Sequence, residues 1–180
     1  MKLVSITLHQ VSIPLVTPFE TSFMRETEKD CYLVEATFDT DRGRITGWGE
    51  SVAMISPLYS SEYVAAGIDV TRRWLAPILF GVEDLTAETV GWHLRHVVGH
   101  PMAKSALEMA VIDAQLQVSG QSFKSYLAGS STPCPRGCRW ASRTPSRRRS
   151  GSSATTSTRL RADQAEDQAG QGHRAGGRRT

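Results

Sequence analysis

Cysteine is scarce in this chain of 180 residues, which contains only three cysteines. Cys31 stands alone in a predicted strand, where we expect a free, buried thiol. Cys134 and Cys138 form a C-x3-C pair, but no further pair of ligands follows at zinc-finger spacing, and His173 alone does not complete a site. We therefore expect no zinc site, and we expect a reducing, cytoplasmic location.

Long apolar runs are also missing, and none approaches the length needed to cross a membrane. The N-terminal "MKLVSITLHQ" carries one basic residue and then alternates, without an apolar run or a small-residue cleavage site. We therefore expect neither a signal peptide nor an association with membranes.

Large apolar side chains almost disappear after residue 128, where only Trp140 and Leu160 remain. Residues 1–128 carry a net charge of −5 and residues 129–180 a net charge of +8, so the average composition hides two different segments. Too little apolar surface is present in the second segment to offset the entropy lost on ordering. We expect one folded domain over residues 1–128 and a disordered tail rich in Arg, Ser, Gly and Ala over residues 129–180.

The first half of the folded segment has the pattern of strands. "KLVSITLHQVSIPL" alternates as a strand that ends at Pro14, and "TPFETSFMRETEKD" follows as a loop without regular period. "CYLVEATF" and "ITGWGES" are two more strands, joined by the turn "DTDRGR". Three consecutive strands with short connections predict an antiparallel meander.

The second half has the pattern of helices. A first helix begins at a cap at Ser60 or Ser61, with Glu62 in its first turn, and stops or bends at Pro77. "TAETVGWHLRHVVG" is a second helix, with Thr86 as its cap and Gly99 as its terminator. The third and strongest helix is "PMAKSALEMAVIDAQLQVSG", which starts at a proline, ends at a glycine and has a broad apolar face. The fold class is therefore α+β, a three-stranded antiparallel meander followed by a helical bundle.

Four stretches together resemble the N-terminal capping domain of the enolase superfamily, muconate-lactonizing subgroup. They are "IPLVTPFETSF", "GWGES", "PLYSSEY" and "GHPMAKSALEMAVIDAQL", and the last of them is the most specific. The resemblance is strongest to the branch that holds o-succinylbenzoate synthase and N-succinylamino acid (N-acylamino acid) racemase. It covers residues 1–128.

The resemblance implies a two-part enzyme in which this cap lies over a (β/α) barrel. In the intact family, barrel carboxylates hold Mg2+ and barrel lysines remove and return the proton alpha to a carboxylate of a small substrate. The outcome is dehydration of a menaquinone precursor or racemisation of an N-acylamino acid. We expect neither a catalytic residue nor a metal ligand in this chain, and we expect no Mg2+ to bind to it.

The resemblance also implies that two loops of the cap shape substrate specificity. Phe19 and Phe23 could instead anchor their loop to the core of the cap, and this alternative stays open. The residues carried over are Pro18, Phe19, Thr21, Phe23 and Met24 in the first loop, and Met54 and Tyr59 in the second.

Other polar residues suggest chemistry only at first sight. We interpret Trp48 as a packing residue and Glu50 as a cap or ion-pair partner. Glu108 and Asp113 lie five positions apart on a helix and do not face each other. Three histidines lie near one another in the sequence, at positions His93, His96 and His100. No carboxylate completes a metal site with them, so we assign them to a solvated face.

The tail can be explained by a change of reading frame. In the family, a barrel strand with a K-x-K motif follows the third helix, and no such strand follows here. When the reading frame is moved forward by one base, the genetic code determines the type of residue at five positions near the end, whatever codons are used. Asp163 and Asp167 become Ile or Thr, and Gln164, Glu166 and Gln168 become Lys or Arg. We therefore hypothesise a plus-one frame change near Gly129, followed by an early stop, which leaves a truncated and inactive cap.

Two alternatives belong to other functional classes. The basic "RTPSRRRS" could bind phosphates weakly and without sequence specificity, although no aromatic residues interleave with it. The cap could also be an interaction module that docks on an intact homologue. Because its helices would normally bury apolar faces against a barrel, an isolated cap should expose them and associate with itself.

Overall fold

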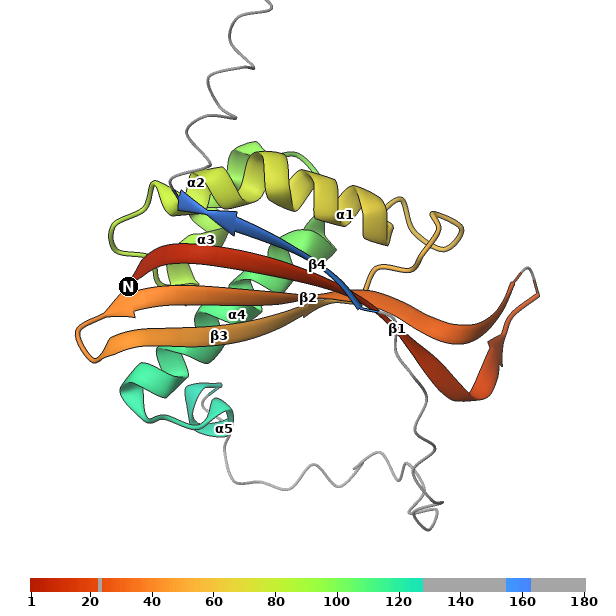
Figure 1. The fold of residues 1–180 in the computed structure, drawn as a ribbon, viewed down its shortest axis with the longest axis horizontal. Helices are drawn as coiled ribbons and strands as arrows, with labels where there is room; N and C mark the ends of the chain where they lie inside the picture. The colour runs from red at the N-terminus through yellow and green to blue at the C-terminus, as the bar shows by residue number, and fades with distance from the viewer. Residues whose placement is uncertain (23, 128–154, 163–180) are drawn as a thin grey trace, which may run out of the picture.

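The structure is a computed structural model that describes residues 1–22, 24–127 and 155–162. Its sheet is antiparallel throughout, with the strand order β3-β2-β1-β4 (Figure 1). The strands are β1 (Lys2–Glu20), β2 (Arg25–Thr40), β3 (Gly43–Ser51) and β4 (Thr155–Arg161).

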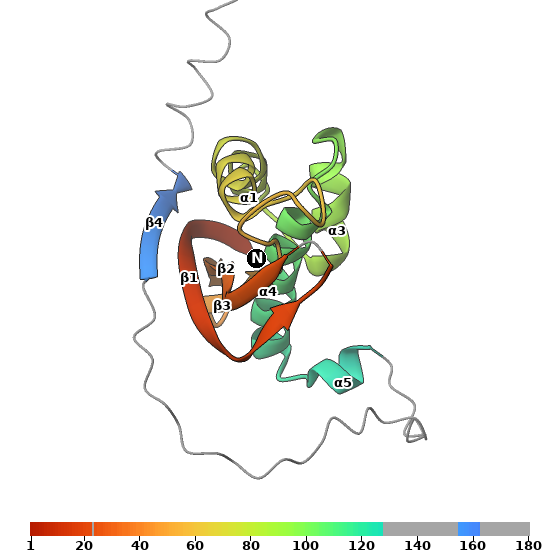
Figure 2. The same ribbon diagram turned by 90° about the vertical axis from the view of Figure 1, so that its right-hand side faces the viewer.

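The helices gather on one face of this sheet, as the end-on view shows (Figure 2). They are α1 (Val64–Val70), the π-helical turn η1 (Thr71–Leu75), α2 (Ala76–Phe80), α3 (Ala87–His93), the 3-10 turn η2 (Leu94–His96), α4 (Pro101–Ser119) and the short α5 (Phe123–Tyr126). The predicted α+β class, an antiparallel sheet with helices, is confirmed.

The core lies between the sheet and the helices. On β2, alternate residues are fully buried, as the period-two pattern predicts; they are Tyr32, Val34, Ala36 and Phe38. On β1 the alternation shifts at an irregularity between Leu3 and Ser5, after which Ile6 and Leu8 point into the core. Each shift of one residue exchanges the two faces of a strand, so this bulge keeps both halves of β1 apolar on the inside.

A fourth strand corrects the predicted three-stranded meander. β4 comes from the segment that we expected to be disordered, and it pairs with β1 on the side away from β2. The expectation of disorder is therefore wrong for residues 155–162, because backbone pairing to an open edge orders a short strand that has almost no apolar side chains of its own. The remaining residues of the tail lie outside the described part of the chain.

The β1–β2 hairpin is longer than the sequence predicts. We expected β1 to end at Pro14 and a loop to follow, but pairing resumes with Phe19 opposite Glu26 after an irregularity. This arm extends beyond the helices (Figure 1). Its ladder depends on backbone hydrogen bonds and not on burial, so the sequence carries no apolar period there.

The predicted first helix starts and bends differently. Its N-cap is Tyr63, without a side-chain cap, so the caps proposed at Ser60 and Ser61 are wrong. Residues 64–80 stay helical through Pro77, because the chain widens into the π-helical η1 just before it. Since Pro77 has no N–H to donate, the wider turn accommodates it without ending the helix.

The start of the second helix and both ends of the third are confirmed, but Gly99 is not the terminator of the second helix, because α3 ends at His93 and a 3-10 turn continues only to His96. Thr86 and Thr89 form a capping box at the start of α3. Pro101 occupies the first turn of α4, and Gly120 ends this helix with a positive φ of 69°.

Two glycines of β3 let α4 lie directly against the strand. A Cβ on Gly49 would overlap the backbone carbonyl of Ala106, and a Cβ on Gly47 would lie 2.9 Å from the Cβ of Ala114. The "GWG" of the sequence is therefore a contact surface for the small residues of α4. This close contact positions β3, and with it the loop that follows.

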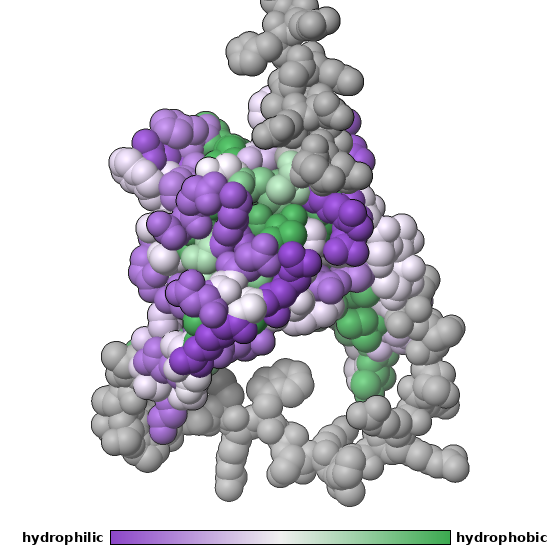
Figure 3. All heavy atoms as spheres, turned by 60° about the vertical axis from the view of Figure 1, so that its left-hand side comes forward, coloured by the Kyte–Doolittle hydropathy of each residue, from purple (hydrophilic) through white to green (hydrophobic). Residues whose placement is uncertain are grey.

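Among the residues that the structure describes, no helix is both long and apolar enough to cross a bilayer. Polar residues cover most of the face seen in Figure 3, which brings forward the end that carries the β2–β3 turn.

Candidate functional site

The two predicted specificity loops project from the same end of the molecule. The first is the tip of the β1–β2 hairpin, and the second is the segment 52–63 between β3 and α1 (Figure 1). A hydrogen bond from Lys29 Nζ on β2 to the carbonyl of Val52, 3.2 Å long, links the two at their base. The sheet thus positions both loops from one side.

Hydrogen bonds between Thr21 and Met24 close the tip of the hairpin. The N–H of Thr21 donates to the carbonyl of Met24 at 2.8 Å, and the N–H of Met24 donates to the Thr21 hydroxyl at 3.2 Å. Pro18 and Phe19 belong to β1, and half of the Phe19 side chain is exposed. Phe23 lies outside the described residues.

The second loop is pinned where its ends meet. Met54 and Tyr63 form an isolated parallel bridge, and the N–H of Val64 donates to the carbonyl of Met54 at 2.9 Å. Between these points the chain carries exposed apolar side chains, with Tyr59 at 73% exposure and Leu58 at 63%. Of the predicted residues, Met54 is therefore held at the base of the loop and Tyr59 points into solvent.

Glu62 anchors the end of this loop, and the sequence analysis missed its role. We placed Glu62 in the first turn of its own helix, but its carboxylate instead accepts the N–H of Met102 at 3.1 Å and that of Ala103 at 3.3 Å. The residue is only 6% exposed. A buried carboxylate at the N-terminus of α4 satisfies two otherwise unpaired donors and matches the helix dipole. No local pattern could reveal a contact between residues forty positions apart.

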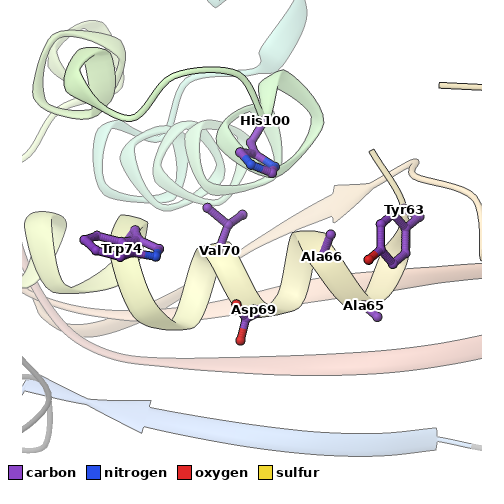
Figure 4. A pocket seen from close by; sticks show the side chains of 7 residues that line it. All are labelled: Tyr63, Ala65, Ala66, Asp69, Val70, Trp74 and His100. Carbon is purple, nitrogen blue, oxygen red and sulfur yellow. The ribbon is translucent and has the colours of Figure 1, made fainter. Parts of the chain in front are cut away.

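A shallow depression of about 390 Å³ begins where the second loop ends (Figure 4). Its wall comes from α1 and η1, including Tyr63 and the exposed Trp74, and from His100 across the gap. His100 adopts a left-handed conformation with φ 55°, and its buried Nδ1 has no hydrogen-bond partner. The sequence "GHP" could have indicated this left-handed turn, because a glycine precedes His100 and the proline that follows starts a helix.

Two other residues singled out in the sequence, Trp48 and Asp113, make contacts with each other or with neighbouring side chains. The ring of Trp48 stacks on His9 with ring centroids 5.7 Å apart, and the backbone N–H of Trp48 donates to the Asp113 carboxylate at 2.9 Å. Burial raises the pKa of the Cys31 thiol, and the negative charge of Glu50 raises it further. Cys31 is a free, buried cysteine, as predicted.

The described residues do not provide a metal centre. Over residues 1–22, 24–127 and 155–162, no three His, Cys, Asp or Glu side chains form a group that could hold a metal ion. The residues present therefore do not fit the Mg2+ that the family employs, and no catalytic step through this ion follows from them.

Three of the four lysines within residues 1–127 are held by contacts with other groups. Lys2 pairs with Glu83 at 2.7 Å, Lys29 binds the carbonyl of Val52, and Lys104 donates to the carbonyl of Val97. This geometry offers two loops on a rigid support, which can contact a substrate.

A meander with helices on one face and two loops at one end has the architecture of a capping domain. The chain belongs to the family described as mandelate racemase / muconate lactonizing enzyme, N-terminal domain, which it matches over residues 3–128. The predicted membership of the enolase superfamily is confirmed.

Named relatives agree with this assignment. An N-succinylamino acid racemase of Amycolatopsis sp is 45% identical over 136 residues, which are 74% of this chain and 36% of that protein. An o-succinylbenzoate synthase of Bacillus subtilis is 33% identical over 132 residues, 73% of this chain and 35% of that protein. The chain thus spans about a third of the length of the curated relatives that it matches.

Solved structures show the same fold. An enolase superfamily member from Listeria innocua superposes with a TM-score of 0.66 at 28% identity, covering 72% of this chain and 34% of that one. An N-succinyl Arg/Lys racemase from Bacillus cereus superposes with a TM-score of 0.58 at 27% identity, covering 66% of this chain and 31% of that one.

Proposed function

We propose that residues 3–128 are the substrate-specificity cap of an enzyme of the o-succinylbenzoate synthase and N-succinylamino acid racemase type. The reaction is removal of the proton alpha to a carboxylate in a small substrate. The named relatives support this proposal, since they carry these two activities and match the chain at 45% and 33% identity. The ligands of Mg2+ and the catalytic lysines would lie outside the described cap.

One observation carries the role of the loops. Large apolar side chains lie exposed on both loops at one end of the molecule, among them Phe19, Leu58 and Tyr59. Exposed apolar clusters of this kind mark surfaces that are covered in the working state. In the proposed enzyme, the two loops cover the organic part of the substrate, and the barrel covers the rest of this end.

A frame change explains why the similarity stops. The family match ends at residue 128, and a forward shift by one base forces alternating basic and β-branched residues from Asp163 to Gln168. We infer that residues after about 129 are out-of-frame sequence and that the chain alone has no turnover. Sequencing the gene tests this inference, which fails if a one-base correction opens no barrel-like continuation.

The functional experiment compares two polypeptides, the present chain and its frame-corrected form. Both are assayed with Mg2+ on an N-succinylamino acid and on the o-succinylbenzoate precursor. We expect turnover only in the frame-corrected form. Turnover by the purified present chain would contradict the proposal.

The loops are tested in the frame-corrected form. Phe19→Ala and Tyr59→Ala should raise KM by about tenfold, since each removes apolar contact with the substrate. Val16→Ala is the matched control, because Val16 is 99% exposed on the same hairpin but outside the predicted set. An equal rise in KM in all three variants would contradict a specific role for Phe19 and Tyr59.

The isolated cap should also associate with itself through the apolar side chains that the barrel would cover. Exposed examples on the helices are Trp74, Trp92 and Leu127. Size-exclusion chromatography at increasing concentration tests this expectation, and a constant monomer mass would contradict it.

A further inference from the structure

The two edges of the β1–β2–β3 meander are closed in different ways. On β3, side chains of α4 occupy the outward backbone groups: Asp113 accepts the N–H of Trp48 at 2.9 Å, and Gln117 donates to the carbonyl of Thr46 at 2.9 Å. On β1, the outer edge is instead covered by β4, which runs beside it in both ribbon views (Figures 1 and 2). Without β4, this edge of the sheet would expose a row of unpaired backbone groups.

The β1–β4 ladder is regular. It contains seven consecutive antiparallel pairs without a register break, from Ser5 opposite Arg161 to Val11 opposite Thr155. Side chains add few specific contacts: His9 Nδ1 lies 2.7 Å from the Ser157 hydroxyl, and Leu160 is the one residue of β4 buried in the core, at 9% exposure. The backbone therefore supplies most of the pairing, and Leu160 anchors it.

The covered edge has the composition of a strand that pairs readily with its own kind. Residues 5–11 read "SITLHQV", which contains no Asp, Glu, Lys or Arg, no proline and no glycine. Uncharged segments of high β-propensity are the ones that add to other strand edges when exposed. The new outer strand is different, because β4 is short and carries Arg159 and Arg161, two devices that discourage further pairing.

We propose that the outer edge of β1, residues 5–11, is a pairing surface for the same edge of a second copy of this chain, and that Thr155–Arg161 covers it within one copy. Two identical antiparallel edges related by a two-fold axis are self-complementary. The connection from Leu127 to Thr155 tethers β4 at an effective concentration that a second copy does not reach in dilute solution. The intact chain therefore keeps its edge closed.

This proposal does not depend on the proposed enzymatic function. Strand addition takes its affinity from backbone hydrogen bonds, so a segment without a counterpart in the family can still fill the edge. The tail would then influence association of the cap even if its sequence is out of frame.

The test uses the full chain with one substitution, Leu160→Asp. A carboxylate at this buried position opposes docking of β4 and should release it. Thr155→Asp is the matched control, since it adds the same charge at the exposed start of β4. At a concentration low enough for wild type to be a monomer, light scattering after size-exclusion chromatography should show a doubled mass for Leu160→Asp and an unchanged mass for Thr155→Asp.

Hydrogen exchange identifies the surface that pairs. In the Leu160→Asp variant, the amides of residues 5–11 that face β4 should be protected at high protein concentration and exchange at least about tenfold faster on dilution. The amides of the same residues that face β2, and those in α4, should stay protected. Unchanged mass with rapid exchange of residues 5–11 would show that the free edge does not pair with a second copy. An unchanged mass with slow exchange would show that β4 does not cover the outer edge of β1. A doubled mass without concentration-dependent protection of residues 5–11 would show that the two copies associate through another surface. Each of these results overturns the proposal.

Discussion

The carboxylate of Glu62 accepts the backbone N–H of Met102 at 3.1 Å, across forty positions of the chain. This contact joins the end of the second predicted specificity loop to the start of α4, and α4 is in turn packed against β3 through two glycines. The loop is therefore held at its two ends by the same helix, directly at Glu62 and through β3 at Ser51. A rigid base with an exposed tip is the arrangement expected of a loop that contacts a substrate.

Replacing Glu62 should destabilise the domain. Glu62→Ala leaves two buried N–H donors at the N-terminus of α4 without acceptors, so we expect the free energy of unfolding to fall by about 2 kcal/mol. Glu62→Gln keeps an acceptor and should lose less. Urea denaturation followed by circular dichroism measures both. Glu83→Ala, which removes an exposed partner of Lys2, is the control and should stay within about 0.5 kcal/mol of wild type; an equal loss in all three variants would contradict the capping role.

Adding a methyl group to β3 should separate it from α4. Gly49→Ala introduces a Cβ that overlaps the carbonyl of Ala106, and neither backbone can move without breaking the sheet or the helix. We expect the free energy of unfolding to fall by about 3 kcal/mol. In Gly91→Ala the new Cβ in α3 meets nothing within 4 Å, and this control should stabilise the domain by up to about 1 kcal/mol. Thermal melts of the two variants test this prediction. Similar melting temperatures would contradict a close contact between Gly49 and α4.

The phenol of Tyr32 should make the domain sensitive to alkali. Burial raises the pKa of Tyr32 above its ordinary value of 10.0, while the nearby hydroxyls of Ser51 and Thr71 lower it without forming well-aligned hydrogen bonds. Because the folded pKa exceeds the unfolded one, the stabilising contribution is complete below about pH 10 and is lost as the pH rises through the folded pKa.

Tyr32→Phe removes this ionisation and should make the decline in melting temperature between about pH 9 and about pH 11 less steep. At neutral pH the substitution should change the melting temperature little, because the hydroxyl that it removes is buried without a partner. A decline as steep as that of wild type would show that Tyr32 is not the group responsible.

The Cys31 thiol should resist modification in the folded protein. Only 2% of the residue is exposed, and burial together with Glu50 raises its pKa, so the reactive thiolate is scarce. In a chain with Cys134→Ser and Cys138→Ser, we expect labelling of Cys31 by a thiol reagent at about pH 8 to be roughly a hundredfold slower than in urea. Rapid labelling under native conditions would mean that this part of β2 opens easily.

Much of the fold could be predicted from the sequence. The alternation in "CYLVEATF", the capping threonine at Thr86, and the proline and glycine that frame α4 are local signals, and each lies where predicted. The four stretches that resemble the capping family are also short segments of sequence, and the family was confirmed from them.

Other features depended on contacts between distant segments. The extension of the hairpin to Glu20, the wide turn before Pro77 and the role of Glu62 were predicted wrongly or missed. At the hairpin and at Glu62, a backbone group finds its partner in a distant segment, and the local pattern of apolar residues carries no record of this pairing.

The sequence by itself determined the layers of this protein, since the period of its apolar residues decides which segments are strands, which are helices and which faces they bury. Only the tertiary structure decided where the backbone groups at the edges of those elements are satisfied. Three contacts of this kind are the pairing of β4 with the edge of β1, the cap that Glu62 provides at the start of α4, and the packing of the β3 glycines against α4. The physical reason is that hydrogen bonds and close contacts between backbones form between almost any residues that the fold brings together, whereas burial selects residues by their side chains.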